Sequence, residues 1–508
     1  MTTAKRYNPL LMLFHFCKLV RNSIFFVIYF FVIKAGSEST FITYGRVVFF
    51  IVFGLTLISI ILKWFTHKYE LDYRSFHLYK GIFSKSERTI PFSKIQNVNR
   101  HTSLFHRIFK VTSFNFETGI TGEDAAVRFE VISQKEANRM EMHMKSTVKE
   151  ELATIHANEC KYIPSVEEEV KKEISNRTNH YKPTKKDIIK ASFTSLSFLV
   201  LIPFISSFYF KINEIFHVEN KAVGIFEKLI GSWWMMTIII IVFVIASITF
   251  GIVRTFLKYG NYQISSDHDR IYITKGLIDE TAFSIAKEKV QAIEIKQSFM
   301  KRLLGLAEVK LTSAGGLSSD EDMLEINSLY PYLPVKRAYE IVSEILPFYE
   351  ISQKMTPLPI KSFWVRILWP SWFWIIATIL LFYFKLTVLE VEEAWWILSA
   401  ILLIIIVVSR LLVFFNTFYI LNNDFIQFKT GSFTTSLFVS KRDKIIEVNV
   451  TRNLIQKMLG LASIGTINRA KPVQHAGIDH VSFEMADSFY KWYMERRNEI
   501  KSKLNERV

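Results

Sequence analysis

The chain has 508 residues, of which half are hydrophobic and 22% are charged. The length suffices for three or four domains, and so much charge excludes a protein embedded wholly in a membrane. The net charge of +16 favours an anionic partner, either nucleic acid or a membrane surface.

Apolar runs near the roughly 20 residues that a membrane-spanning helix needs occur as three pairs. They lie at about 20–33 and 44–63, at 191–210 and 233–254, and at 364–384 and 394–416. Lys18 and Arg21 interrupt the first apolar segment, so we expect residues 8–19 to form an amphipathic segment at the membrane interface. A cleaved signal peptide is the alternative interpretation of the N-terminal segment, but this segment lacks the small-residue pattern of a cleavage site. The sequence therefore predicts six transmembrane helices in three hairpins.

The connections inside the three pairs are short and carry little positive charge. Connections 34–43 and 211–232 are neutral, and connection 385–393 has a net charge of −2. The opposite helix ends are rich in lysine and arginine, with Arg366 and Arg410 among them. Because positively charged residues stay on the cytoplasmic side, both termini and all the large segments are expected in the cytoplasm.

A similar segment follows each of the three hairpins. It opens with a tyrosine and reaches a glycine in "YELDYRSFHLYKG" (69–81), "YQISSDHDRIYITKG" (262–276) and "YILNNDFIQFKTG" (419–431). A lysine lies thirteen positions after that glycine in every copy, and a second basic residue lies thirteen positions after the lysine. The repeated positions are Gly81, Lys94 and Arg107; Gly276, Lys289 and Arg302; and Gly431, Lys444 and Lys457. Agreement over three gapless segments indicates an internal repeat.

The pattern inside each copy is mostly period two, as in "RIYIT" and "FIQFK", which predicts antiparallel strands with one buried face. The glycines are expected to have positive φ and so to be structural. A helical segment closes each copy, at 133–155, 333–350 and 485–504. We therefore expect a curled sheet capped by a C-terminal helix, three times over.

These features together resemble the bacterial pleckstrin-homology (PH)-like membrane proteins. The shared pattern is two spans followed by Tyr…Gly, then Lys-Ile/Val-Gln, then Ser-x-x-x-Arg-x-Leu-Gly-Leu and a strand ending in Ala-Gly-Gly. The second copy, "EKVQAIEIKQSFMKRLLGLAEVKLTSAGG", fits best, whereas Lys110 replaces the usual glycine in the first and "KII" replaces Lys-Ile-Gln in the third. The likeness covers essentially the whole chain and, with three copies, is similar to the YdbT-like subgroup.

The resemblance implies a seven-stranded PH-type barrel for each soluble unit, an integral membrane location and often a smaller single-unit companion protein. It implies no settled biochemical activity. The predicted fold class is an α+β membrane protein with six transmembrane helices in three hairpins, each followed by a cytoplasmic PH-like barrel or sandwich with a C-terminal helix. The predicted divisions are 1–66 (amphipathic segment and hairpin 1), 67–158 (PH-like domain 1), 159–190 (charged linker), 191–258 (hairpin 2), 259–352 (PH-like domain 2), 353–416 (hairpin 3) and 417–508 (PH-like domain 3).

The runs "SLFHRIFKV", "SFMKRLLGL" and "NLIQKMLGL" place apolar residues at i, i+1, i+4 and i+5, on one face of a short helix. Two interpretations are open. Either this face closes the barrel while Arg107, Arg302 and Lys457 sit in water, or the helix lies against the inner membrane surface. In the second case each basic residue near an anionic leaflet adds about 1 kcal/mol of attraction.

No catalytic, metal or cofactor site is predicted. His101 and His106 have no partner at ligand spacing, and His475 and His480 flank Asp479 in a loop. Phosphate-loop and nucleophile-elbow spacings do not occur. The only two cysteines lie far apart, so they form no disulfide framework and indicate a reducing environment for the soluble parts.

We therefore expect a multi-pass cell-membrane scaffold or binding protein, and not an enzyme. It would present three cytoplasmic PH-like domains to a partner membrane protein or to the inner lipid surface. The expected partners are membrane lipids and a smaller single-unit PH-like membrane protein, without nucleic acid, and protection of the cell envelope is compatible with this role. The alternative is a transporter or channel component built from the six helices, although the spans contain few ionisable groups.

Overall fold

The computed structural model describes residues 4–505 except 35, 37–38, 82–84, 119–125, 156–176, 195–232, 314–327, 369–370, 385–393, 423 and 471–472. The predicted span 191–210 is therefore described only to residue 194, and the predicted linker 159–190 only from residue 177. The chain forms two units, Met1–Arg177 with Tyr272–Ile285 and Thr178–Ile271 with Ala286–Val508.

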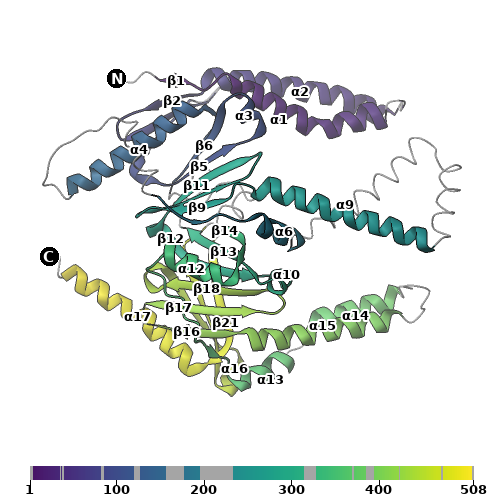
Figure 1. Ribbon diagram of the computed structural model, residues 1–508, viewed down its shortest axis with the longest axis vertical. Coiled ribbons are helices and arrows are strands. Elements are labelled where there is room, and N and C mark those ends of the chain that lie inside the picture. Colours follow the sequence, from purple (N-terminus) through teal and green to yellow (C-terminus); the bar gives the residue numbers. More distant parts are fainter. Residues whose placement is uncertain are drawn as a thin grey trace. The chain divides into compact units, whose positions relative to one another are not determined.

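Four helices of the described chain are long and apolar enough to cross a membrane, and they coincide with the predicted hairpins 1 and 3. They are Leu10–Ile33, Thr40–Thr66, Ile360–Phe384 and Ala394–Asn416. In the first unit α1 (Leu10–Val27) continues directly into the π-helix η1 (Ile28–Ile33) and lies beside α2 (Thr40–Thr66) (Figure 1). The predicted amphipathic segment and the predicted first span are thus one helix.

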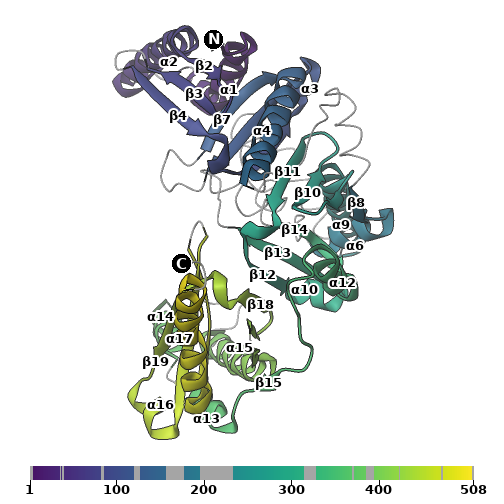
Figure 2. The same cartoon turned by 90° about the vertical axis from the view of Figure 1, so that its left-hand side faces the viewer.

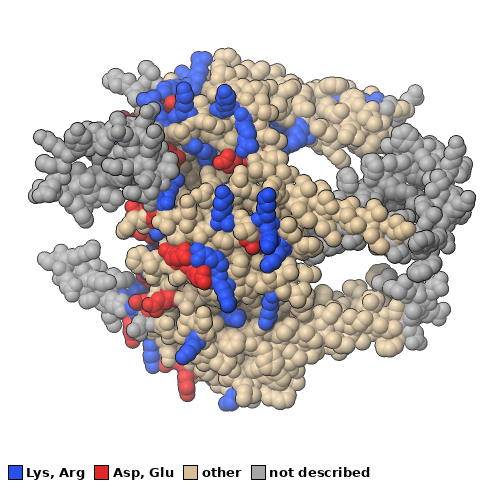
Figure 3. Space-filling model, in the orientation of Figure 1, with Lys and Arg blue, Asp and Glu red and all other residues tan. Residues whose placement is uncertain are grey.

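The second unit carries the remaining membrane-type helices. α13 (Ile360–Leu368) and α14 (Trp372–Phe384) precede α15 (Ala394–Asn416) along the chain. On the face shown in Figure 3, no Lys, Arg, Asp or Glu is seen on the part of the α14–α15 hairpin that is farthest from the sheets, whereas these residues gather over the sheets. α9 (Trp233–Tyr259) covers the predicted span 233–254 and packs on α6 (Lys185–Thr194).

Each of the two fully helical hairpins is inserted between the first two strands of a sheet. β1 (Lys5–Arg6) precedes α1 and pairs with β2 (Lys68–Leu71), which follows α2. β15 (Thr356–Pro357) precedes α13 and pairs with β16 (Phe418–Leu421), which follows α15. The sequence did not predict β1 or β15, because two residues show no periodicity. Each hairpin is therefore tied to its sheet at both ends.

The first unit contains a four-stranded antiparallel sheet in the order β1-β2-β3-β4, with β3 at Ser75–Lys80 and β4 at Ser86–Pro91. The 3-10 helix η2 (Phe92–Lys94) then leads into the second half of copy 1. That half consists of β5 (Ile95–Thr102), α3 (Leu104–Ile108), β6 (Val111–Thr118), β7 (Ala126–Ser133) and α4 (Gln134–Ile155).

The outer edge of β5 is covered by a strand of the second copy. β11 (Glu280–Ala286) pairs antiparallel with β5, with Glu280 opposite Thr102 and Ser284 opposite Val98. The other elements of copy 2 are β8 (Thr178–Tyr181), β9 (Gln263–Ser266), β10 (Arg270–Lys275), η5 (Lys287–Lys289), β12 (Val290–Gln297), α10 (Phe299–Leu303), β13 (Leu306–Ser313), β14 (Ser328–Pro334) and α12 (Val335–Ile345).

Copies 2 and 3 share a sheet in the same way. A seven-stranded sheet of the second unit has the order β14-β13-β12-β18-β17-β16-β15, so β18 (Thr435–Lys441) covers the outer edge of β12. Copy 3 also contains β17 (Phe425–Gly431), η6 (Arg442–Lys444), β19 (Ile445–Thr451), α16 (Leu454–Leu459), β20 (Leu461–Asn468), β21 (Gln474–Ser482) and α17 (Phe483–Asn505). α17 lies across the β19-β20-β21 sheet (Figure 2).

The cores consist of the period-two apolar positions together with the closing helices. In the first unit Phe76, Phe114 and Phe116 are fully buried and pack with Met140 of α4. In the second unit Phe428 of β17 packs in the same cluster as several residues of α17. Burying one such side chain contributes about 1.5–3 kcal/mol. The three helices α4, α12 and α17 coincide with the predicted closing helices.

Gly431 is required by the turn between β17 and β18. Its φ is +134°, and a Cβ built on it would lie 2.0 Å from the carbonyl oxygen of Thr434. Gly276 has the same environment in copy 2, where a Cβ would lie 2.0 Å from the carbonyl oxygen of Asp279. Since a side chain has neither the space nor the backbone conformation here, these glycines fix the first hairpin of their copies.

We predict that Gly431→Ala destabilises the second unit by at least about 1–3 kcal/mol, because it combines backbone strain with a steric clash. Thermal unfolding of the purified protein in mild detergent, followed by tryptophan fluorescence, measures the effect. Gly54→Ala in α2 is the control, because its added Cβ meets no atom within 4 Å. An unchanged unfolding temperature for Gly431→Ala would contradict the assignment.

Candidate functional site

The nine repeated positions fall in three equivalent places. The glycines Gly81, Gly276 and Gly431 end the first long strand of each copy and all have positive φ. The lysines end the three 3-10 helices η2, η5 and η6, which connect the first half of each copy to the second. The remaining basic residues lie on the short helices α3, α10 and α16, and all three are exposed. The constant spacing follows from strands and joints of equal length.

In copy 1 the short helix contacts the hairpin turn of the next copy. Arg107 donates from Nη1 to the carbonyl oxygen of Leu277 at 3.0 Å, and its Nη2 lies 3.6 Å from the carboxylate of Glu280. The backbone N–H of Leu104 donates to the carboxylate of Asp279 at 3.2 Å. The Arg107–Glu280 ion pair is half-exposed, so it contributes no more than about 1 kcal/mol. Its position nevertheless places α3 beside the β5–β11 pairing.

The same helix in copy 3 carries the most exposed apolar side chains of the three. In copy 2 the ring of Phe299 lies 6.3 Å from that of Phe433, in the turn that follows β17. The outer apolar residues of the three helices are exposed by 55% and 71% (Leu104, Ile108), 55% and 74% (Phe299, Leu303), and 83% and 86% (Leu454, Met458). These side chains are therefore not buried in a barrel, and their exposure is greatest in copy 3.

β19 is an edge strand in the described part of the chain, unlike its counterparts β5 and β12. The register shows the equivalence, because Asn99 of β5 faces Phe283 and Glu294 of β12 faces Phe438. Asn99 is buried and Glu294 half-buried, but the equivalent Asn449 of β19 is exposed. Copy 3 thus exposes a surface that the next copy covers in copies 1 and 2.

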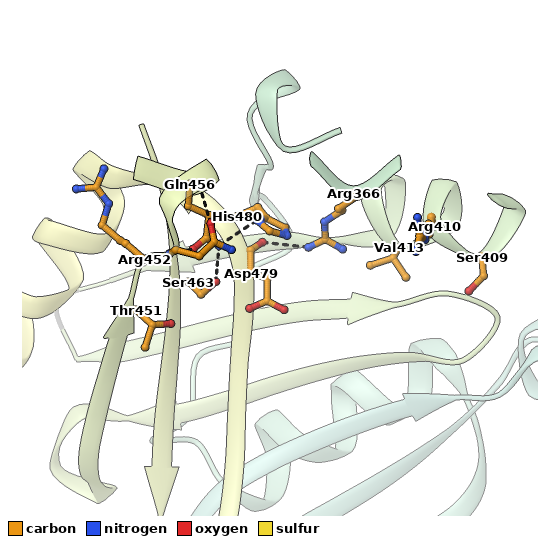
Figure 4. Close-up of a pocket in the computed structure, with 11 residues that line it drawn as sticks. Arg366, Ser409, Arg410, Val413, Thr451, Arg452, Gln456, Ser463, Asp479 and His480 are labelled. Atoms are coloured by element: carbon orange, nitrogen blue, oxygen red, sulfur yellow. Dashed lines mark hydrogen bonds between the residues drawn. The ribbon is translucent and has the colours of Figure 1, made fainter. Parts of the chain in front are cut away.

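A cavity of about 580 Å³ lies where α13 and α15 meet the β-strands of copy 3 (Figure 4). It is lined by Arg366, Ser409, Arg410, Val413, Thr451, Arg452, Asn453, Gln456, Ser463, Asp479 and His480. Three arginines and one aspartate make this lining positively charged. Arg366 extends from α13 toward Asp479 and His480, with Arg410 on one side of it and Arg452 at the far end of the row (Figure 4). Such a lining can bind an anion.

The floor of the cavity is a small hydrogen-bond network. Gln456 donates from Nε2 to the hydroxyl of Ser463 at 2.8 Å and to Nδ1 of His480 at 3.0 Å. Gln456 also belongs to a capping box with Asn453, which fixes the start of α16. His480 has a φ of +64°, a conformation that histidine adopts more readily than most residues. Burial, and then the nearby Arg366, lower the pKa of His480.

Sequence reasoning missed this cavity. It assigned Arg366 and Arg410 to charged helix ends and His480 to a loop, and it did not single out Arg452. The only available signal was the presence of two arginines in the last hairpin, at positions that are not basic in the first. Within the described ranges, no group of three or more His, Cys, Asp or Glu residues is placed to hold a metal ion.

Comparison with known proteins identifies the class. The model of the bacterial PH domain family matches residues 23–148, 200–348 and 374–497, one match for each copy. The chain therefore belongs to the bacterial PH domain family, as the sequence pattern predicted.

A transmembrane relative covers nearly the whole chain. UPF0699 transmembrane protein YdbT of Bacillus subtilis (strain 168) is 25% identical over 507 residues, which are 97% of this chain and 98% of the relative. No solved structure matches the chain. Together with the four apolar helices, the relative supports a membrane protein with repeated PH domains.

We predict that copy 3 loses local stability as the pH falls from 7.5 to 5. The folded-state pKa of His480 is lowered, so the unfolded chain binds more protons, and the stabilisation present above pH 6.5 is lost as the pH falls. Protonation also removes the Nδ1 acceptor that Gln456 uses. Hydrogen exchange of residues 474–482 at several pH values measures the loss. The variant His480→Asn keeps an acceptor and tolerates positive φ, so an equal pH dependence in this variant would contradict the prediction.

Proposed function

We propose that the protein is a membrane-anchored assembly scaffold whose PH domains join by strand addition, and that β19 receives a further PH-like unit. The partner is a smaller, single-unit PH-like membrane protein. The proposal includes six transmembrane helices in three hairpins, with both termini and all PH-like units in the cytoplasm. Protection of the cell envelope stays a prediction from the sequence.

One observation carries the proposal. Two of the three equivalent edges are already occupied by a strand of the following copy, and both pairings have the same register. Each backbone hydrogen bond in such a pairing adds about 0.5–1.5 kcal/mol net, and the ladder covers five residue pairs on β5 and six on β12. The equivalent stretch of copy 3 is Val448–Arg452, of which Val448–Thr451 belong to β19. In the described part of the chain, no strand pairs with β19 on this side.

β11 and β18, the strands that cover β5 and β12, are more apolar than β4, the edge strand that a second molecule of this chain could offer to β19. The strands that cover β5 and β12 place Phe283 and Phe438 at equivalent positions, where both rings are buried. Counting from Gly81, Gly276 and Gly431, the equivalent residue of β4 is Arg88, beside Glu87. Because β4 lacks the buried aromatic residue, a separate PH-like unit fits the β19 edge better than a second copy of this chain.

The test is photo-crosslinking from β19 in native membranes. A photoreactive amino acid at Asn449 is expected to crosslink to a small PH-like membrane protein, at the edge strand of its first sheet. The same amino acid at Glu87 of β4 is the matched control and is expected to give no such product. Absence of a PH-like adduct, together with solute flux in liposomes that contain the purified protein, would replace this function with transport.

A second prediction concerns the apolar side chains of α16. Met458→Arg places a charge on a residue that is 86% exposed, so the fold should persist while the yield of the copurified partner falls at least about tenfold. Val473→Arg, also an exposed apolar position of copy 3, is the control and should retain the partner. Equal retention by both variants in a gentle-detergent pull-down would exclude α16 from the interface.

A further inference from the structure

The cavity beside α13 carries positive charge that the fold itself does not require. Copy 1 builds the same arrangement of strands and helices with neutral or titratable residues at the equivalent positions. Counted from the β1–β2 and β15–β16 pairings and from the repeated lysines, the residues equivalent to Arg366, Arg410 and Arg452 are His15, Ile60 and Thr102. His15 there lies 3.1 Å from the carboxylate of Glu130, so copy 1 places an acidic partner at this point.

Hydrogen bonds to main-chain carbonyl oxygens orient the three arginines of the cavity. Arg366 donates to the carbonyl oxygen of Asp479 at 3.0 Å, and Arg410 donates to the carbonyl oxygen of Ile367 at 3.1 Å. Arg452 donates in the same way to the carbonyl oxygen of Leu461 at 3.1 Å. A main-chain carbonyl orients a guanidinium group but carries no net charge.

One donor of this cavity has no acceptor. Nε of Arg366 is buried and lacks a hydrogen-bond partner among the described residues. Leaving a buried charged donor unpaired is costly, so such groups commonly mark a bound water, ion or ligand. Arg410 bonds to the residue next to Arg366, which places the two guanidinium groups in neighbouring positions (Figure 4).

The helices α13 and α16, which border the cavity, both carry exposed apolar side chains. Trp364 and Leu368 of α13 are exposed by 57% and 74%. A second hollow of about 680 Å³ shares Arg452 and Asn453 with the cavity and is further lined by Leu454, Ile455 and Lys457. An anion that binds here can therefore extend an apolar chain along α13 and α16.

We propose that Arg366 and Arg410 bind the phosphate group of an anionic phospholipid, with its acyl chains against the exposed apolar residues of α13 and α16. Guanidinium groups match phosphate oxygens in pairs of parallel hydrogen bonds, and the bound phosphate supplies the acceptor that Nε of Arg366 lacks. Free phosphate has the same recognisable group, but it makes no use of the apolar flank. The lipid site borders the proposed partner surface, because Thr451 and Arg452 line the cavity. Arg366 and Arg410 lie outside that surface, so variants of these two arginines test the lipid site separately from partner docking.

The experiment compares two phosphate sources with the full-length protein. After delipidation in detergent, the protein is titrated with phosphatidylglycerol, with phosphatidylcholine and with inorganic phosphate at constant ionic strength, and thermal unfolding and native mass spectrometry report binding. We expect phosphatidylglycerol to bind and stabilise the protein, whereas phosphatidylcholine and inorganic phosphate have little effect. The double variant Arg366→Gln/Arg410→Gln should bind phosphatidylglycerol at least about tenfold more weakly.

Two controls keep the result interpretable. Arg74→Gln changes an exposed arginine of the first unit and should bind as the unaltered protein does. The single variant Arg410→Gln, which leaves Arg366 in place, serves if the double variant unfolds, and it should also bind more weakly. Binding of inorganic phosphate that depends on Arg410 would retain the anion site but overturn the lipid as its ligand. Equal binding of phosphatidylglycerol by all the variants would overturn the site.

Discussion

The hydrogen-bonding needs of strand edges organise this chain. An edge strand presents a row of N–H and C=O groups that another strand can pair with, and here two such rows, on β5 and β12, are paired with strands of the next copy. The short helices α3 and α10 lie beside these pairings and contact the incoming hairpin. The repeat is therefore also the unit by which the sheets join, and among the three equivalent strands β19 alone has an unpaired edge in the described part of the chain.

The membrane-type helical hairpins are connected to the sheets by strand pairing at both of their ends, and not by a flexible linker. A short strand precedes each of the two fully helical hairpins and pairs with the strand that follows it. In copy 1 the indole of Trp64, near the end of α2, donates to the carbonyl oxygen of Tyr7 at 3.0 Å. Because both ends of the hairpin are held, the orientation of the sheet relative to its own helices is fixed. A site such as the arginine cavity, built from helix and strand together, depends on that fixation.

Much of the fold is visible in the sequence because its signals are local. Period-two alternation located β3, β10 and β17, and the constant spacing from Gly81, Gly276 and Gly431 located the joints. The pairing of β5 with β11 and of β12 with β18 left no such signal. A strand shows the same alternation of apolar and polar residues whether its neighbour belongs to its own copy or to the next. The cavity was missed for a related reason. Arg366 and His480 are more than a hundred residues apart, and only the folded chain brings a helix end beside a strand end.

The charged edge of β4 makes the two ends of the three-copy series different in their capacity to pair with a further strand. Glu87 and Arg88 lie on β4, an edge strand of its sheet in the described part of the chain, and Lys85 directly precedes it. Charged edges discourage further pairing. A head-to-tail interface between identical molecules would otherwise propagate into an open filament. Under the proposed function, a charged β4 edge that accepts no strand would end the series after one added subunit. Stoichiometry would then be set by a few ionic side chains on one short strand.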